Sequence, residues 1–86
     1  MTYVQAPEMN SANERVFIDE VADILEADPE KLTLASDFRE AADFWSSLVG
    51  FALLCYLEER HSAVLSVEAF IECRTIGDLY VAITRQ

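Results

Sequence analysis

The uncharged segment at residues 44–57 most constrains what this chain can fold into. It runs for 14 residues without a charged side chain and is apolar on nearly every side when wound as a helix. That length falls short of the roughly 20 residues that a membrane span needs. Ser46 or Ser47 can cap its start, and charged residues end it at 58–61. A chain of 86 residues cannot surround such a helix, so we expect one side of it to face solvent or a partner.

Three further helices are predicted around this segment. The first covers residues 11–26, where Ser11 and Glu14 have capping-box spacing. Ser66 starts a short third helix, and Thr75 starts the last one. The predicted core consists of the apolar residues at helical spacing: Phe17, Val21, Ile24, Leu25, Leu53, Leu54, Leu57, Phe70, Ile76, Leu79, Tyr80 and Ile83.

Two segments, residues 1–10 and residues 27–43, lie outside the predicted helices. Residues 1–10 show no period, and Pro7 argues against a helix, so we predict a flexible N-terminal lead-in before one domain at 11–86. Pro29 ends the first helix, and residues 27–43 are predicted as a long loop with scattered apolar anchors. The predicted fold is therefore all-α: a four-helix bundle with a long loop between its first two helices and a short third helix.

Composition excludes several classes of function. The chain has 16 acidic and 6 basic side chains, a net charge of -10, which argues against binding nucleic acid or an anionic membrane. An apolar fraction of 52% excludes a disordered acidic tail. No signal peptide is visible, so we expect a cytoplasmic protein. Cys55 and Cys73 stand apart from each other and are expected to be reduced, buried thiols.

The sequence suggests no catalytic residue and no metal site. His61 stands six residues after Cys55, which puts the two on different helix faces and leaves His61 as a cation at a helix C-terminus. Asp37, Glu40 and Asp43 lack the pattern of a calcium loop and fit a solvated acidic loop. No glycine-rich phosphate loop is present. We therefore predict that the chain is not an enzyme.

The serine pair at residues 46–47 has two readings. Serine is a common helix cap, and this alone would explain its presence. A hydroxyl at the positive end of a helix also suits a phosphodiester, because the helix dipole stabilises negative charge there. Attachment of such a group would need a separate enzyme, since no base accompanies the serine.

Four short motifs resemble those of the acyl and peptidyl carrier proteins, and together they span roughly residues 13–83. They are Ser46-Ser47-Leu48, Leu57-Glu58-Glu59, Thr75-Ile76-Gly77-Asp78-Leu79, and the loop residues 28–33 with Asp37-Phe38. The resemblance implies that Ser47 carries 4'-phosphopantetheine, whose thiol would hold an acyl or aminoacyl cargo as a thioester.

The resemblance also implies partners. These are a phosphopantetheinyl transferase, a cargo-loading ligase or acyltransferase, and the downstream synthase enzymes of a fatty-acid, polyketide or peptide pathway. The chain would be a stand-alone, monomeric carrier that binds neither nucleic acid nor membranes. Its partner-binding residues would be Leu48, Phe51, Ala52, Cys55, Glu58, Glu59, Glu68 and Glu72.

The chain departs from the family pattern at the front of its central helix. Ser46 stands where the family usually has Asp, and Val49, Gly50 and Ala52 occupy positions that are often acidic. These departures favour apolar docking and a specialised pathway over housekeeping fatty-acid synthesis. The loss of Asp also keeps an alternative open, a four-helix interaction module that is never modified.

Overall fold

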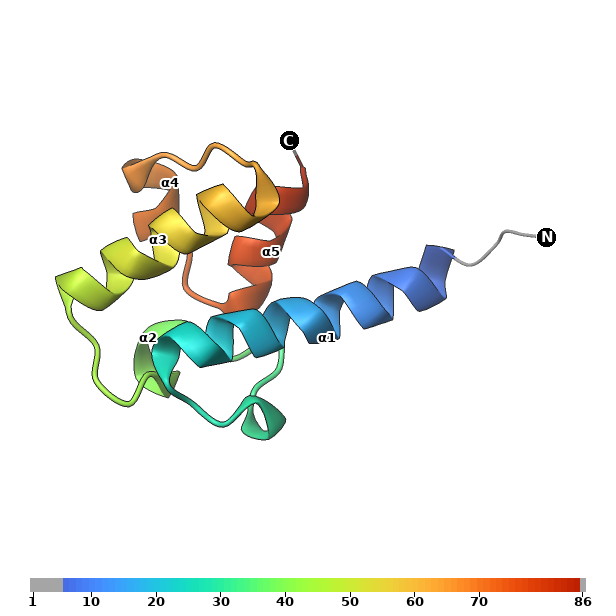
Figure 1. Cartoon of the computed structure of the whole chain (residues 1–86), viewed down its shortest axis with the longest axis horizontal. Coiled ribbons are helices and arrows are strands. Elements are labelled where there is room, and N and C mark those ends of the chain that lie inside the picture. The colour runs from blue at the N-terminus through green and yellow to red at the C-terminus, as the bar shows by residue number, and fades with distance from the viewer. Residues whose placement is uncertain (1–5, 86) are drawn as a thin grey trace.

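The computed structural model describes the backbone of residues 6–85 and the side chains of residues 13–85. Figure 1 shows helices joined by loops in a small bundle. The elements are α1 (Ala6–Leu25), a 3-10 turn η1 (Pro29–Lys31), α2 (Phe38–Ala41), α3 (Ser47–His61), α4 (Val67–Glu72) and α5 (Ile76–Thr84). The predicted all-α class is confirmed, and α3 is the helix expected from the uncharged segment.

Helix α1 begins earlier than predicted. It starts at Ala6, so residues 6–10 of the expected lead-in are helical and the Ser11–Glu14 pattern lies inside the helix. The argument from Pro7 was wrong, because proline is tolerated in the first turn, where its missing N–H has no helical partner. The remainder of the expected lead-in, residues 1–5, lies outside the described residues.

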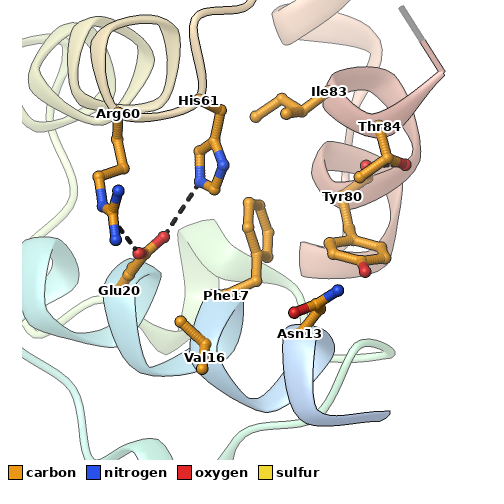
Figure 2. Close-up of a pocket in the computed structure, with 9 residues that line it drawn as sticks. All are labelled: Asn13, Val16, Phe17, Glu20, Arg60, His61, Tyr80, Ile83 and Thr84. Atoms are coloured by element: carbon orange, nitrogen blue, oxygen red, sulfur yellow. Dashed lines mark hydrogen bonds and ion pairs between the residues drawn. The ribbon is translucent and has the colours of Figure 1, made fainter. Parts of the chain in front are cut away.

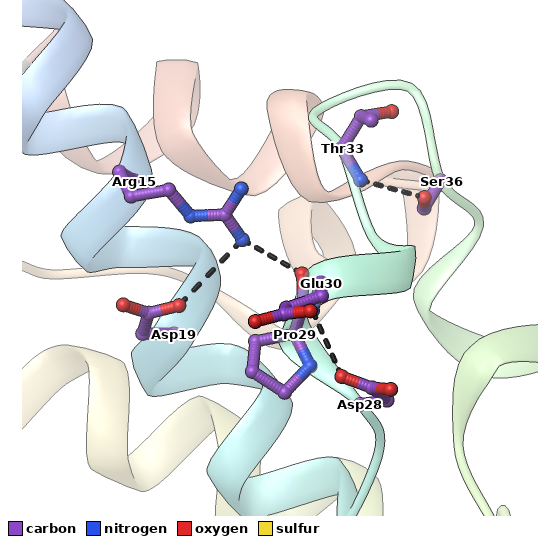
Figure 3. A network of polar contacts seen from close by, with 7 residues as sticks. All are labelled: Arg15, Asp19, Asp28, Pro29, Glu30, Thr33 and Ser36. Carbon is purple, nitrogen blue, oxygen red and sulfur yellow. Dashed lines mark hydrogen bonds and ion pairs between the residues drawn. The ribbon is translucent and has the colours of Figure 1, made fainter.

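The long loop contains two short helical elements that the sequence analysis did not predict. Asp28 caps η1 through a hydrogen bond from the Glu30 N–H, and Arg15 of α1 donates to the Pro29 carbonyl at 2.7 Å (Figure 3). Asp37 caps α2, because its carboxylate accepts from the first N–H groups of that helix. The acidic residues of the loop thus act partly as helix caps.

The loop also pairs with the start of α5. The N–H groups of Ile76 and Gly77 donate to the carbonyls of Ser36 and Leu34 at 2.9 and 2.7 Å. A Cβ atom at Gly77 would lie 2.9 Å from the Leu34 carbonyl oxygen, closer than real Cβ atoms come. Glycine is therefore required there so that the loop can approach α5.

The core forms where α1 packs against α3 and α5 (Figure 1). Ile24 and Tyr80 are half-buried, and all other predicted core residues are buried. The predicted core list omitted seven further buried hydrophobic residues: Ile18, Ala22, Leu32, Phe38, Ala63, Leu65 and Cys73. Leu32 and Phe38 come from the long loop, which therefore packs over the core rather than standing away from it.

A capping box at the start of α5 makes stability depend on pH. The N–H groups of Arg74 and Thr75 donate to the Asp78 carboxylate and lower the pKa of Asp78. The ionised form is favoured in the fold, so the stabilisation is full above the ordinary Asp pKa of about 3.9 and is lost as pH falls through the lowered value.

We expect Asp78→Asn to destabilise the chain at pH 7 by a few tenths to about 1 kcal/mol. This difference from the unsubstituted chain should shrink below about pH 4 and vanish at lower pH, because the Asp78 carboxyl is then also neutral. Thermal melts of both proteins from pH 7 to pH 2 measure the difference. A gap that stays constant over this range would contradict the assigned role of the charge.

Candidate functional site

The two serines before α3 have different roles. Ser46 is the N-cap: its backbone is extended, and its Oγ accepts a hydrogen bond from the Val49 N–H at 3.3 Å. Ser47 is the first helical residue and is exposed. Its hydroxyl makes no hydrogen bond to another described residue. The structure therefore decides which serine caps the helix, and the hydroxyl of the other one is free for chemistry.

The start of α3 is electrostatically suited to an anion. Its first turn has no acidic side chain, so no side chain of that turn competes for the positive end of the helix dipole. Ser46 caps the helix at the position where the family pattern has Asp, and both residue types are good N-caps. The departure at this position therefore removes a charge without removing the helix cap.

An apolar groove of about 390 Å³ opens beside Ser47, between α3 and α4. We call it the α3–α4 groove. The buried side chains of Leu54 and Phe70 line it together with the exposed side chains of Val67 and Ile71. Val67 and Ile71 were missing from the predicted site. Their spacing of four residues on α4 is the signal that could have indicated them.

Trp45 forms one wall of this groove. A Cβ atom at Gly50 would lie 3.0 Å from Cζ2 of the Trp45 indole, so the glycine lets the ring lie directly against α3. The indole also meets the Phe38 ring edge-on, at 5.7 Å between centroids. In the sequence, Gly50 stands out only because it occupies a position that is often acidic in the family. In the fold it makes room for an aromatic ring.

Arg39 joins α2 to the end of α4 at the same groove. Its Nη1 donates to the Cys73 carbonyl at 2.8 Å, and its Nη2 donates to the Ile71 carbonyl at 3.3 Å. The guanidinium lies 4.7 Å from the centroid of the Phe38 ring. Arg39 therefore has a positioning role, because it ties the short helices that frame the groove to each other.

The predicted partner-binding residues of α3 are largely exposed. Leu48 is 77% and Phe51 62% exposed, and Ala52 and Cys55 are also exposed. Their spacing places all four along one side of α3. The predicted acidic contacts Glu59, Glu68 and Glu72 are likewise exposed. The expectation that one side of the central helix faces outward is confirmed.

The two cysteines differ in environment. Both are free thiols, and Cys73 is buried as expected. The same expectation was wrong for Cys55, which is exposed because the outward side of α3 includes it. Burial raises the pKa of Cys73, and the nearby Asp78 raises it further. Cys73 is therefore a neutral thiol with little nucleophilic character at pH 7.

Glu58 differs from the other acidic residues of the predicted partner surface. Glu58 is half-buried, and its Oε2 accepts a hydrogen bond at 3.0 Å from the N–H of Leu65. Leu65 is a buried residue. This bond fixes the loop between α3 and α4, so the Glu58 carboxylate has a structural partner within the chain.

We expect Glu58→Ala to cost about 1–3 kcal/mol of unfolding free energy, because it leaves the Leu65 N–H without its acceptor. Glu58→Gln keeps an acceptor oxygen and should cost less. Urea denaturation of both variants measures this, with Glu59→Ala as the matched exposed control. Equal stability of the Glu58→Ala and Glu59→Ala variants would contradict the structural role.

A second cavity, of about 310 Å³, lies between α1, α5 and the end of α3 (Figure 2). The Glu20 carboxylate is 3.1 Å from His61 Nε2 and 3.1 Å from Arg60 Nε. His61 lies in the last turn of α3, as predicted, and pairs with an acid there. No serine or cysteine lines this cavity, and the Thr84 hydroxyl in its lining donates to the Tyr80 carbonyl at 2.8 Å rather than to the histidine.

The model of one protein family matches the chain, described as the phosphopantetheine attachment site and covering residues 15–83. The chain belongs to this family. No curated protein and no solved structure matches it. The phosphopantetheine-binding domain carries a covalently attached 4'-phosphopantetheine group, so the predicted cofactor and carrier function are confirmed.

Membership also settles the question of catalysis. Phosphopantetheine-binding domains are non-catalytic and act together with phosphopantetheinyl transferases and pathway enzymes. The prediction that the chain is not an enzyme is thereby confirmed. In addition, none of the described helices combines the length and the apolar character that crossing a membrane requires.

Proposed function

We propose that Ser47 is the attachment residue, and that this carrier presents an acyl or aminoacyl group to enzymes of a specialised biosynthetic pathway. The observation that carries the proposal is the exposed Ser47 hydroxyl at the start of α3, inside the matched region and at the edge of the α3–α4 groove. Ser46 is a weaker candidate, because its hydroxyl already caps the helix.

The residues around Ser47 support attachment without performing it. When bound, phosphopantetheine supplies a terminal thiol that holds cargo as a thioester. Ser47 supplies the accepting oxygen, and the first turn of α3 stabilises the negative charge of a phosphodiester. No described side chain forms a hydrogen bond with the Ser47 hydroxyl and could serve as its base. The transferase must therefore supply the group that removes the proton.

The α3–α4 groove favours an apolar cargo. Its walls are aromatic and aliphatic, and its one charged lining residue is Arg39. That guanidinium is already engaged by two carbonyl groups. A charged cargo would find no free counterion among the lining residues, whereas an acyl chain would replace water on Phe51, Val67 and Ile71. Acyl cargo is thus better supported than aminoacyl cargo.

The outward side of α3 supports partners with an apolar docking surface. Leu48 and Phe51 are large, exposed and near Ser47 in the chain, while Glu59 on α3 and Glu68 and Glu72 on α4 are exposed acidic side chains. Apolar contact would provide affinity, and the acidic side chains would speed encounter with basic partners. This balance differs from the more acidic helix front that the family usually has, which is why we propose a specialised pathway.

Mass spectrometry of the intact chain tests the proposal. The chain is incubated with coenzyme A, magnesium and a broad-specificity phosphopantetheinyl transferase, and the product is mapped by peptide. We expect a gain of one phosphopantetheine on the peptide that contains Ser47. No gain under conditions that fully convert a control carrier would favour an unmodified interaction module or a dedicated transferase. Modification at Ser46 would show that the wrong serine is proposed.

A further inference from the structure

Helix α4 forms one wall of the α3–α4 groove and is loosely held. Val67, Phe70 and Ile71 line the groove from this helix. Of its six residues, which the structure describes in full, only Phe70 is buried. Among the described elements, the closely packed helix pairs all include α1, and α4 belongs to none of them. A helix this short is not stable by itself, so bonds to other segments must keep α4 in place.

The segments on either side of α4 are anchored independently of it. Before the helix, Leu65 is buried, and its N–H donates to the Glu58 carboxylate at 3.0 Å. After the helix, the Arg74 carbonyl accepts from the Phe38 N–H at 3.3 Å, and the Arg74 N–H donates to Asp78 at 2.9 Å. These bonds fix both ends of the segment and do not involve the helix between them.

Arg39 supplies the bonds that hold the end of α4 itself. The last carbonyls of a helix have no partner within it, and the Arg39 guanidinium donates to those of Ile71 and Cys73 at 3.3 and 2.8 Å. The same guanidinium lies 4.7 Å from the centroid of the Phe38 ring and 5.6 Å from that of Trp45. Arg39 is therefore held by the aromatic rings on its own side of the groove while it binds α4 on the other.

We propose that α4 opens as a unit between Leu65 and Arg74 while the rest of the chain stays folded, and that Arg39 is the clasp that sets how often it opens. Short elements with little buried surface are the ones that open locally in folded proteins. Opening would uncover Leu54 and Phe70, which are buried in the closed groove. That the opening lets an acyl chain enter rests on the proposed function, but the opening itself requires neither the arm nor its cargo.

Cys73 is a built-in reporter of this opening. Its carbonyl is one of the two that Arg39 binds, and its thiol is free and only 8% exposed. A thiol reagent can therefore reach Cys73 only when the end of α4 opens or the whole chain unfolds. Burial raises the pKa of Cys73, so the reaction is followed at mildly alkaline pH, where more of the opened thiol is ionised.

The experiment follows the reaction of Cys73 with an aromatic disulfide that releases a coloured thiolate. All chains carry Cys55→Ser, which removes the exposed thiol, and none is modified at Ser47. Below the unfolding transition, the rate should change little with urea, because local opening exposes little surface. Arg39→Gln should raise the rate about ten- to a hundredfold, since it removes two bonds from a charged donor. Arg39→Lys keeps the charge and one donor group, so it should restore part of the protection.

Arg15→Gln is the matched control. Arg15 also donates to a loop carbonyl, that of Pro29 at 2.7 Å, but lies outside the α4 region, so its loss should leave the Cys73 rate unchanged. A rate that rises with the full urea slope of global unfolding would mean that α4 opens only when the chain unfolds, and would overturn the proposal. Equal acceleration by Arg39→Gln and Arg15→Gln would also overturn it. Neither result bears on Ser47, whose modification is tested separately by mass spectrometry.

Discussion

Replacing Ser47 with alanine should abolish the gain of phosphopantetheine and leave the fold intact. Ser47 is exposed, and its hydroxyl makes no hydrogen bond within the described residues. Removing the hydroxyl therefore takes away the oxygen that the transferase modifies, and it breaks no hydrogen bond of the helix. Alanine is also a good helix former at this position. Intact-protein mass spectrometry after transferase treatment should show no mass increase, and the melting temperature should match that of the unsubstituted chain.

Ser46→Ala is the matched control for this substitution. It keeps the acceptor hydroxyl of Ser47, so loading should persist. It removes the bond from the Val49 N–H to Ser46 Oγ, which should cost about 1 kcal/mol of stability, as loss of an N-cap typically does. The two variants should therefore show opposite phenotypes. A Ser47→Ala chain that still becomes loaded would refute the assignment of the attachment residue.

Phe38→Ala should have the largest effect on stability. The ring is 0% exposed and packs at 5.7 Å between centroids against both Trp45 and Phe70. Removing a buried phenylalanine ring costs about 3–5 kcal/mol, while a domain of this size has only about 5–10 kcal/mol in total. We expect the urea midpoint to fall by a large fraction of its value, with part of the population unfolded near 37 °C.

Phe51→Ala is the control for Phe38→Ala, because it makes the same substitution at an exposed position. Its ring is 62% exposed, so the same truncation should change the free energy of unfolding by less than about 1 kcal/mol. Urea denaturation followed by circular dichroism at 222 nm measures both variants. Comparable stability of the two would mean that the long loop does not anchor the core, contrary to the position of Phe38.

Patterns among neighbouring residues were sufficient to predict the helices that frame the site. Ser66 and Thr75 cap α4 and α5 as predicted, and the apolar period along α1 identified Phe17 and Val21 as core. A helix cap is a bond between neighbours in the chain, and a helical period repeats within a few residues. Both can therefore be recognised without knowing what the helix packs against. The misjudged start of α1 also followed from a local rule, the one on Pro7, applied too strictly.

The sequence by itself determined the helical class, the apolar character of the central helix and the pattern that matches a phosphopantetheine carrier. Only the tertiary structure decided that Ser46 caps α3 and frees Ser47, and that Phe38 enters the core from the loop. It also decided that Arg39 binds carbonyls near the end of α4. These features join residues that are far apart in the chain or depend on backbone geometry, which no local pattern encodes. The groove beside Ser47 arises in the same way, from helices that meet only in the folded chain.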